Sequence, residues 1–290
     1  MNNAKTAVVT GATAGIGLSA AKMLVKAGIN VIGVGRDPDR CRAAKEAIIA
    51  ETNNTNIRYI TGDLSSILEV TRIASEIKTL LAENGGKLDI LMNVAGTVSS
   101  WFVGTPDGYE LQFAVNHLAP FLLTHELLPC LLSASAARVL VVSSGSHYHT
   151  RISWKDVMMR RHYSCLAAYK QSKLCNVLFI TELARRLKDT PVCTYAIDPG
   201  LADTDIGLKG TTDIERFVWK LRQHSGTPPE IPAKYMVNVA TKPEYAGKTG
   251  LYWQNGKEKK PSSVSRDQKQ GEILWKLSEK LCGIKDKCPI

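Results

Sequence analysis

The chain has 290 residues, a hydrophobic fraction of 44% and a formal net charge of +10 at neutral pH. A hydrophobic fraction of this size supports a large buried core and excludes a disordered chain. The basic residues are scattered, and the densest run, at 257–260, is short. The charge therefore indicates a solvated surface that favours anionic small molecules, not a surface for nucleic acid or membrane.

The cysteines and the N-terminus indicate the cellular compartment. None of the seven cysteines forms a CxxC pair or a zinc-ligand spacing, which is typical of reduced thiols and predicts no metal site. His147 and His149 lack a third ligand at a usable spacing, so we assign them to a polar loop. The first residues read as a strand and not as a signal peptide, and no stretch reaches the ~20 apolar residues of a membrane span. We expect a soluble, cytoplasmic protein without a transmembrane anchor.

Apolar runs alternate with amphipathic stretches of helical length along most of the chain. The expected strands lie at 7–9, 31–34, 57–61, 88–92, 138–142 and 192–197, and the expected helices at 16–27, 37–51, 67–80, 109–132 and 166–187. Strands that alternate with helices form βαβ units, whose right-handed crossovers build a doubly wound parallel sheet. The pattern predicts an α/β protein with a Rossmann-type sheet, as a single domain over residues 1–290. Glycines and prolines around a short helical piece at 201–235 predict a small substrate lid.

A glycine-rich loop, TGATAGIG at residues 10–17, follows the first expected strand directly. Gly11, Gly15 and Gly17 allow a tight turn and bring the backbone close to a pyrophosphate, which then lies at the positive end of the next helix. Glycines often serve turns alone, but here the strand, loop and helix occur in the order that a nucleotide site needs. We therefore interpret the loop as a dinucleotide-binding site.

The end of the second expected strand distinguishes between the two nicotinamide cofactors. An acidic residue there usually binds the ribose 2′-hydroxyl of NAD, whereas an arginine accommodates the 2′-phosphate of NADP. The strand ends in Val34-Gly35-Arg36, which favours NADP(H). The alternative is that Arg36 is a surface residue and that Asp37 reaches the ribose.

Tyr169 and Lys173 lie four residues apart in a strongly helical segment, so their side chains share one face. An adjacent ammonium group favours the phenolate and lowers a tyrosine pKa that is otherwise near ~10. Such a tyrosine can exchange a proton with an alcohol or carbonyl oxygen. The pair alone is common in structural helices, and its weight comes from the residues that accompany it.

Two serines, Ser143 and Ser144, follow the fifth expected strand. Side chains at the carboxyl ends of parallel strands line the crevice where ligands bind. A serine there can donate a hydrogen bond to a substrate oxygen. We expect one of the two to do so and the other to serve as a capping group.

Several short motifs occur in order along the chain: TGxxxGxG, NVAG at 93–96, the serine after the fifth strand, YxxxK, and the Pro-Gly pair at 199–200. Together they resemble the short-chain dehydrogenase/reductase family over nearly the whole chain. The segments YKQSKLCNVLF at 169–179 and LWKLSEKLCG at 274–283 resemble the retinol-dehydrogenase-like branch of that family. The resemblance implies an oxidoreductase that interconverts an alcohol and a carbonyl compound.

The resemblance also implies a catalytic role for each matching residue. Tyr169 would be the general acid in reduction and the general base in oxidation. Lys173 would lower the pKa of Tyr169 and hydrogen-bond the nicotinamide ribose. Ser144 aligns with the serine that polarises the substrate, and Asn116 matches an asparagine that orders a proton-relay water. Homodimers formed through the long helices that carry Asn116 and Tyr169 are common in the family, so a homodimer is a further expectation.

Cofactor contacts are implied in the same way. Asp63 matches an acid that contacts adenine, Asn93 would lie near the adenosine ribose, and Thr204 would contact the carboxamide. The full expected set of cofactor-binding residues is Gly11, Thr13, Gly15, Ile16, Gly17, Arg36, Asp63, Leu64, Asn93, Ala95, Gly96, Tyr169, Lys173, Pro199, Gly200 and Thr204.

Three features depart from the family or branch pattern. Val94 replaces an asparagine, which we expect to alter sheet packing more than chemistry. Asp198 stands before the Pro-Gly pair, where the branch often has histidine. The segment between Ser144 and Tyr169 is longer than the common family spacing, as is usual in the branch.

Apolar residues in two segments predict the substrate class. The segment at 145–168 contributes Tyr148, Ile152, Trp154, Val157 and Met158, and the lid contributes Leu201, Ile206, Leu208, Phe217, Val218 and Trp219. If these side chains face inward, the pocket is largely apolar. We expect a bulky hydrophobic carbonyl compound or alcohol, similar to a retinoid, a steroid or a lipid aldehyde. The alternatives are a reductase of a specialised small-metabolite ketone, a non-catalytic nucleotide-binding scaffold protein and, more remotely, a light-driven tetrapyrrole reductase.

Overall fold

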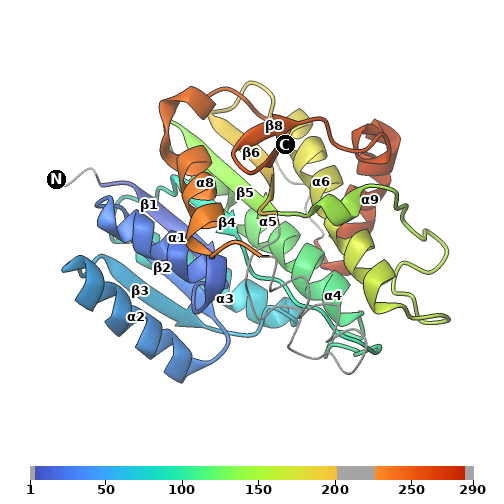
Figure 1. Cartoon of the computed structure of the whole chain (residues 1–290), viewed down its shortest axis with the longest axis horizontal. Helices are drawn as coiled ribbons and strands as arrows, with labels where there is room; N and C mark the ends of the chain where they lie inside the picture. Colours follow the sequence, from blue (N-terminus) through green and yellow to red (C-terminus); the bar gives the residue numbers. More distant parts are fainter. Residues whose placement is uncertain (1–3, 201–225, 285–290) are drawn as a thin grey trace.

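An eight-stranded sheet forms the centre of the protein in the computed structural model, which describes residues 4–200 and 226–284 (Figure 1). The strand order is β3-β2-β1-β4-β5-β6-β7-β8, and neighbouring strands are parallel except β7 and β8. The strands are β1 Thr6–Thr10, β2 Asn30–Gly35, β3 Ile57–Thr61, β4 Ile90–Asn93, β5 Ala137–Val142, β6 Val192–Asp198, β7 Leu251–Gln254 and β8 Lys257–Lys259. The expected α/β, Rossmann-type sheet is confirmed.

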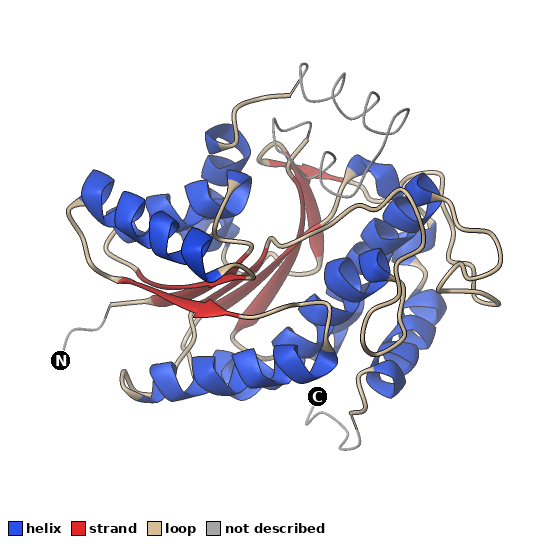
Figure 2. Cartoon of the chain, turned by 90° about the horizontal axis from the view of Figure 1, so that it is seen from below, coloured by secondary structure: helices blue, strands red, loops and turns tan. Residues whose placement is uncertain are grey.

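Helices cover both faces of this sheet (Figure 2). They are α1 Gly15–Lys26, α2 Pro38–Thr52, α3 Ile67–Ala82, α4 Leu111–Phe113, α5 Ala119–Leu132, α6 Cys165–Arg186, α8 Glu230–Thr241 and α9 Gln268–Leu281. Helices α1, α2 and α8 share one apolar core with one face of the sheet, and α3, α5, α6 and α9 share the other core.

The central strands are apolar on both faces because helices cover both. Every residue of β1, with the sequence TAVVT, is buried, and β5, with the sequence ARVLVV, is buried up to its last residue. Near-continuous apolar runs are typical of parallel strands that are enclosed in this way. The carboxyl ends of these strands meet at one edge of the sheet, and the loops that follow them carry the functional residues.

The segment predicted as one helix over 109–132 contains an irregular turn. Glu110 begins it, because its carboxylate accepts hydrogen bonds from the amides of Gln112 at 2.9 Å and Phe113 at 2.7 Å. Residues Ala114–Leu118 then form a π-helical turn between α4 and α5. Turns of this kind are frequent at functional sites. This one carries Asn116 on one side and His117 on the other.

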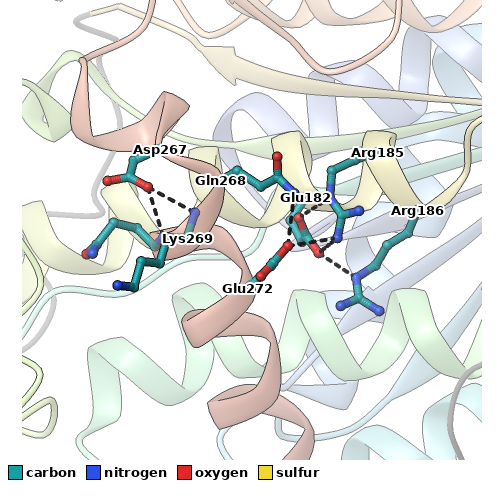
Figure 3. Close-up of polar contacts among 8 residues, drawn as sticks. Glu182, Arg185, Arg186, Asp267, Gln268, Lys269 and Glu272 are labelled. Atoms are coloured by element: carbon teal, nitrogen blue, oxygen red, sulfur yellow. Dashed lines mark hydrogen bonds and ion pairs between the residues drawn. The ribbon is translucent and has the colours of Figure 1, made fainter.

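Helix α9 packs against α6, and charged side chains lie where the two helices meet (Figure 3). The rings of Phe179 in α6 and Trp275 in α9 lie 6.1 Å apart. The buried carboxylate of Glu182 accepts hydrogen bonds from Arg185 and Arg186, both at 2.7 Å. Arg185 also lies 3.5 Å from Glu272 of α9. Helix α9 therefore covers part of α6, one of the two helices through which a homodimer is expected. The expected homodimer stays a prediction.

The C-terminal part of the sheet is a hairpin that the sequence reading did not identify. Strands β7 and β8 pair antiparallel around Asn255 and Gly256, which have φ angles of 50° and 73°. Two consecutive residues with positive φ make the tight turn that favours Asn-Gly. The exposed lysines of β8 lie on the edge of the sheet and disfavour pairing with another chain.

Part of the predicted lid at 201–235 can be described. Residues 201–225, with Thr204 and the apolar residues predicted there, lie outside the described residues. Residues 230–235 belong to α8, which packs against α1 and buries Ala233 in the core. They are therefore part of the covering layer of the sheet. In residues 4–200 and 226–284, no helix is long and apolar enough to cross a membrane, and no three side chains form a metal-binding group.

Candidate active site

Helix α6 places Tyr169 and Lys173 side by side. The helix begins after Ser164, whose hydroxyl accepts a hydrogen bond from the amide of Ala167 at 3.4 Å. Tyr169 is 8% exposed and Lys173 is 2% exposed. The Lys173 Nζ atom lies 5.5 Å from the centre of the Tyr169 ring. A cation in this position stabilises the phenolate, so the phenol is suited to proton transfer.

Burial controls the charge of Lys173. Its Nζ atom donates a hydrogen bond to the carbonyl of Val142, at the end of β5, at 3.1 Å. Burial lowers the pKa of Lys173 to about 8, and the negative charge of Asp198 offsets part of that effect. The ammonium form therefore predominates at neutral pH and is lost as the pH rises through about 8.

Asn116 lies next to this pair and is held from two sides. Its Oδ1 atom accepts a hydrogen bond from the Thr97 amide at 2.7 Å, and its Nδ2 atom donates to the Thr97 carbonyl at 3.0 Å. The Nδ2 atom also donates to the hydroxyl of Ser172 at 3.0 Å, and that hydroxyl donates to the carbonyl of Tyr169 at 2.8 Å. Asn116 thus joins the loop after β4 to α6. Its role in ordering a water stays a prediction.

The structure separates the two serines that follow β5. Ser143 is 1% exposed, and its hydroxyl donates to the carbonyl of Lys173 at 2.8 Å. Ser144 is half-buried and begins the short turn Gly145–His147, where its hydroxyl accepts from the Ser146 amide at 3.2 Å. Ser143 is therefore engaged in packing. Ser144 is the serine that can exchange its weak capping contact for a substrate oxygen.

The glycine loop fits a dinucleotide phosphate. Gly11 and Gly15 have positive φ angles of 68° and 52°. A Cβ atom at Gly17 would lie 2.3 Å from the carbonyl oxygen of Gly11, and a Cβ atom at Gly11 would lie 2.9 Å from the Cα atom of Ala95. No side chain of the described residues caps the amino end of α1, so its first N–H groups remain available to an anion. Thr13 and Ile16, the other expected contacts in this loop, lie between these glycines.

The loop after β4 lies beside the glycine loop. The hydroxyl of Thr10 accepts hydrogen bonds from the amides of Val94 at 3.0 Å and Ala95 at 3.1 Å. The side chain of Asn93 points away from this contact, because its Nδ2 atom donates to the hydroxyl of Thr124 in α5 at 3.2 Å. Asn93 thus fastens the sheet to α5. We therefore expect the backbone of the loop near Ala95 and Gly96, and not the Asn93 side chain, to contact a ribose.

The residues after β2 differ in how their side chains are used. Arg36 is exposed at the end of the strand. The carboxylate of Asp37 caps α2, accepting hydrogen bonds from the amides of Asp39 at 2.9 Å and Arg40 at 3.0 Å. The Asp37 side chain is therefore engaged, through Oδ1, in capping α2. Arg36 is the side chain that remains available to a ligand.

The remaining expected cofactor contacts lie in loops after β3 and β6. The carboxylate of Asp63 accepts a hydrogen bond from the Ser65 amide at 2.9 Å, and Leu64 packs against the core. Gly200, after Pro199, has a φ angle of 73°, and its Cβ position is only 2.8 Å from Oδ1 of Asn255. The cofactor contacts of these residues stay predictions.

The apolar residues of 145–168 that were expected to line a pocket pack on the core of the α6 face. Ile152 is part of the core on the α6 face of the sheet. Trp154 packs against that core and donates a hydrogen bond through Nε1 to Gln270 in α9 at 2.8 Å. Tyr148, Val157 and Met158 pack against the same core. The large side chains of this segment thus pack against a core, and their place in a substrate pocket stays a prediction.

Other residues, which the sequence did not indicate, lie beside Tyr169. Val98, Cys165 and Tyr169 form a small buried apolar cluster, and Tyr163 packs against it. The Tyr163 hydroxyl donates to the carbonyl of Ser99 at 2.8 Å, which fixes the ring. These side chains come from the loop after β4 and from the start of α6, so no local pattern marks them as a group.

Comparisons with known proteins agree with this geometry. Residues 5–214 match the family model of the short chain dehydrogenases. The chain is 35% identical to human retinol dehydrogenase 13, covering 97% of this chain and 85% of that protein. It is also 35% identical to mouse polyprenol dehydrogenase, covering 96% and 84%. A crystal structure of an uncharacterized protein from Mycobacterium paratuberculosis superposes with a TM-score of 0.77 at 29% identity, covering 99% of this chain and 95% of that one. The chain belongs to the short-chain dehydrogenase family.

Proposed function

We propose that this short-chain dehydrogenase uses NADP(H) and interconverts a bulky, hydrophobic carbonyl compound with its alcohol. Oxidoreductase chemistry at a CH–OH group comes with the family. The observation that carries the assignment of the centre is the buried pair of Tyr169 and Lys173, with the lysine Nζ atom 5.5 Å from the ring. The choice of cofactor and the class of substrate rest on separate observations.

The preference for NADP(H) is supported by the different uses of the Arg36 and Asp37 side chains, which follow β2. The Asp37 carboxylate, which could otherwise bind a ribose 2′-hydroxyl, is engaged at the amino end of α2. The Arg36 guanidinium is exposed at the end of the strand, where a 2′-phosphate would lie. An arginine binds a phosphate through paired, charge-assisted hydrogen bonds. NADP(H) should therefore bind more tightly than NAD(H).

The catalytic residues act on the substrate oxygen and its proton. When bound, the nicotinamide supplies the hydride in reduction and accepts it in oxidation. Ser144 donates a hydrogen bond to the carbonyl oxygen and polarises it. Tyr169 gives its phenolic proton to that oxygen, and the Lys173 ammonium stabilises the phenolate that remains. Asn116 holds the loop after β4 against α6, and this contact keeps the catalytic side chains in their relative positions.

The hydrophobic substrate is supported by the surroundings of Tyr169. Val98, Cys165 and Tyr163 form an apolar wall beside the phenol. Trp101 and Leu166, which continue the same two segments, are 51% and 44% exposed. Large exposed apolar side chains near a site are typical of surfaces that bind apolar ligands. The relatives named above are dehydrogenases of retinol and polyprenol, which are both apolar alcohols.

A panel assay tests this proposal. Retinal and nonanal should be reduced with a higher kcat/KM than small polar ketones, and NADPH should support faster turnover than NADH. A preference for small polar ketones would favour the first alternative, a reductase of a specialised metabolite. NADPH binding without turnover on any substrate would favour the second, a nucleotide-binding scaffold. Activity in darkness would exclude a strictly light-driven reaction.

A further inference from the structure

Asp198 is a buried carboxylate at the end of β6, and it is 2% exposed. Its Oδ1 atom accepts a hydrogen bond from the amide of Gly200 at 2.9 Å. Its Oδ2 atom accepts from the hydroxyl of Tyr252 at 2.7 Å and from Nε2 of Gln254 at 2.8 Å. All of these partners are donors, which is the environment that a carboxylate needs in order to be buried in its charged form.

This carboxylate lies at the edge of the sheet where β5 and β6 end and where the turn after Ser144 begins. We call this edge the catalytic edge. Residue Val142 of β5 pairs with Ile197 of β6, so Asp198 is adjacent to the turn that starts at Ser144. The Oδ2 atom of Asp198 lies 3.3 Å from the position that a Cβ atom on Gly145 would occupy. The Val142 carbonyl, in the same strand end, is the acceptor of Lys173. Asp198 therefore lies beside the serine turn and one residue beyond the partner of Val142, whose carbonyl binds Lys173.

Two other titratable groups near Asp198, Tyr252 and His147, are uncharged at neutral pH. Burial beside Asp198 raises the pKa of the Tyr252 hydroxyl. Nε2 of His147 accepts a hydrogen bond from the Ser262 amide at 3.2 Å, so Nδ1 carries the proton that is donated to the Ser144 carbonyl at 2.8 Å. Burial lowers the pKa of His147, which keeps this ring neutral. Among the described residues, Asp198 is the one carboxylate whose charge acts on Lys173.

We propose that Asp198 is a positioning residue, whose negative charge keeps the buried Lys173 in its ammonium form and whose hydrogen bonds tie the catalytic edge to β7. The proposal rests on the assignment of Lys173 to the nicotinamide ribose and to Tyr169. It gives Tyr252 and Gln254 of β7 a function, because their side chains hold the carboxylate whose charge acts on Lys173.

The test is the pH dependence of NADPH affinity, measured by fluorescence titration of the full chain without substrate. In the wild type, the affinity should fall with a midpoint near pH 8, as Lys173 loses its proton. Removal of a nearby negative charge lowers the pKa of a neighbouring ammonium group. In Asp198→Asn and Asp198→Ser, which are neutral but differ in shape, the midpoint should move to lower pH by on the order of one unit.

Two control variants distinguish the effect of the Asp198 charge from the effect of altered packing around it, and from a failure of the proposed function. Tyr252→Phe removes a donor but keeps the carboxylate, so its midpoint should stay close to that of the wild type. Lys173→Met should lose the pH-dependent step, and a step that persists there would refute the assignment of Lys173 and this proposal with it. A step that is lost in Lys173→Met but unshifted in the Asp198 variants would refute this proposal alone. An unshifted midpoint in the folded Asp198 variants, or loss of folding in both, would overturn the proposal and leave Asp198 a structural residue.

Discussion

The nucleotide-binding region and the C-terminal region are built in different ways. In the first, from β1 to the start of α2, the turn of the cofactor loop joins residues close in the chain, such as Gly11 and Gly17, and only Thr10 and Gly11 contact the distant loop after β4 among the contacts described above. In the second, from β7 to α9, the contacts with the catalytic edge cross long stretches of chain. Tyr252 and Asp198 are 54 residues apart, and Ser278 and His117 are 161 apart. Local motifs therefore locate the cofactor site, whereas the charge and packing around the catalytic residues need the folded chain.

The largest expected effect comes from a change at Tyr169. Tyr169→Phe removes the proton donor but leaves the cofactor site, so kcat should fall by about 10²- to 10⁴-fold while NADPH affinity stays largely intact. Steady-state kinetics with retinal and a fluorescence titration with NADPH would measure both quantities. Turnover within a few-fold of the wild type would refute the assignment of Tyr169.

A substitution at Gly17 tests whether the close contact between Gly17 and Gly11 is needed for NADPH binding. A Cβ atom there would lie 2.3 Å from the carbonyl of Gly11, so Gly17→Ala should distort the loop and lower NADPH affinity by more than about tenfold. Gly28→Ala is the control, because its Cβ position meets nothing within 4 Å and only its φ angle of +78° opposes the change. That control should lose some thermal stability and keep its affinity. Equal affinity losses in the two variants would show that the loop does not approach the phosphates.

The cofactor preference can be tested at Arg36, in the same region. Arg36→Ala should weaken NADPH binding by roughly ten- to a hundred-fold, because a charge-assisted contact with phosphate contributes about 1.5–3 kcal/mol. NADH binding should change little, since NADH lacks the 2′-phosphate. Arg40→Ala, at another exposed arginine near the start of α2, is the matched control. Isothermal titration with both cofactors gives the ratio, and equal losses for NADPH and NADH would contradict the assignment.

The C-terminal region should show a smaller, structural effect at Ser278. Nε2 of His117 lies 2.9 Å from the Ser278 hydroxyl, which itself donates to the carbonyl of Leu274. The histidine therefore donates this hydrogen bond, and burial lowers the pKa of His117 to about 3, so its ring is neutral. Ser278→Ala leaves a buried N–H group without its partner and should lower the free energy of unfolding by about 1–3 kcal/mol.

A matched control for that variant is Ser133, the residue that follows α5. Ser133→Ala removes a serine hydroxyl that also donates to a carbonyl four residues earlier, at 2.8 Å, but that is exposed and has no histidine partner. It should change the free energy of unfolding by less than about 0.5 kcal/mol. Denaturant unfolding measures both. Because His117 adjoins Asn116 in the π turn, Ser278→Ala should also lower kcat more than Ser133→Ala does. Equal effects of the two variants on stability would contradict the role of α9.

The sequence predicted the central sheet because its enclosed strands are almost continuously apolar. It located Tyr169 and Lys173 because helical spacing puts them on one face and because the other family motifs accompany them in order. It also contained an Asn-Gly pair at 255–256, the usual mark of a tight hairpin, which would have revealed β7 and β8. The apolar residues at 148–158 were assigned to a pocket, and the structure shows that they also pack on a core. An apolar pattern shows that a side chain is buried and does not show against which surface. The partners of Asp198 come from β7 and the loop after β6, so no spacing could predict them.

The most direct measurement follows the transferred atom. Wild-type protein would be incubated with retinal and with NADPH that carries deuterium on the transferring face of the nicotinamide, and the retinol formed would be examined by mass spectrometry. We expect one deuterium in the retinol made by the wild type, and no product above background with Tyr169→Phe. Unlabelled retinol, or labelled retinol formed equally well by the Tyr169→Phe variant, would contradict the proposed reaction.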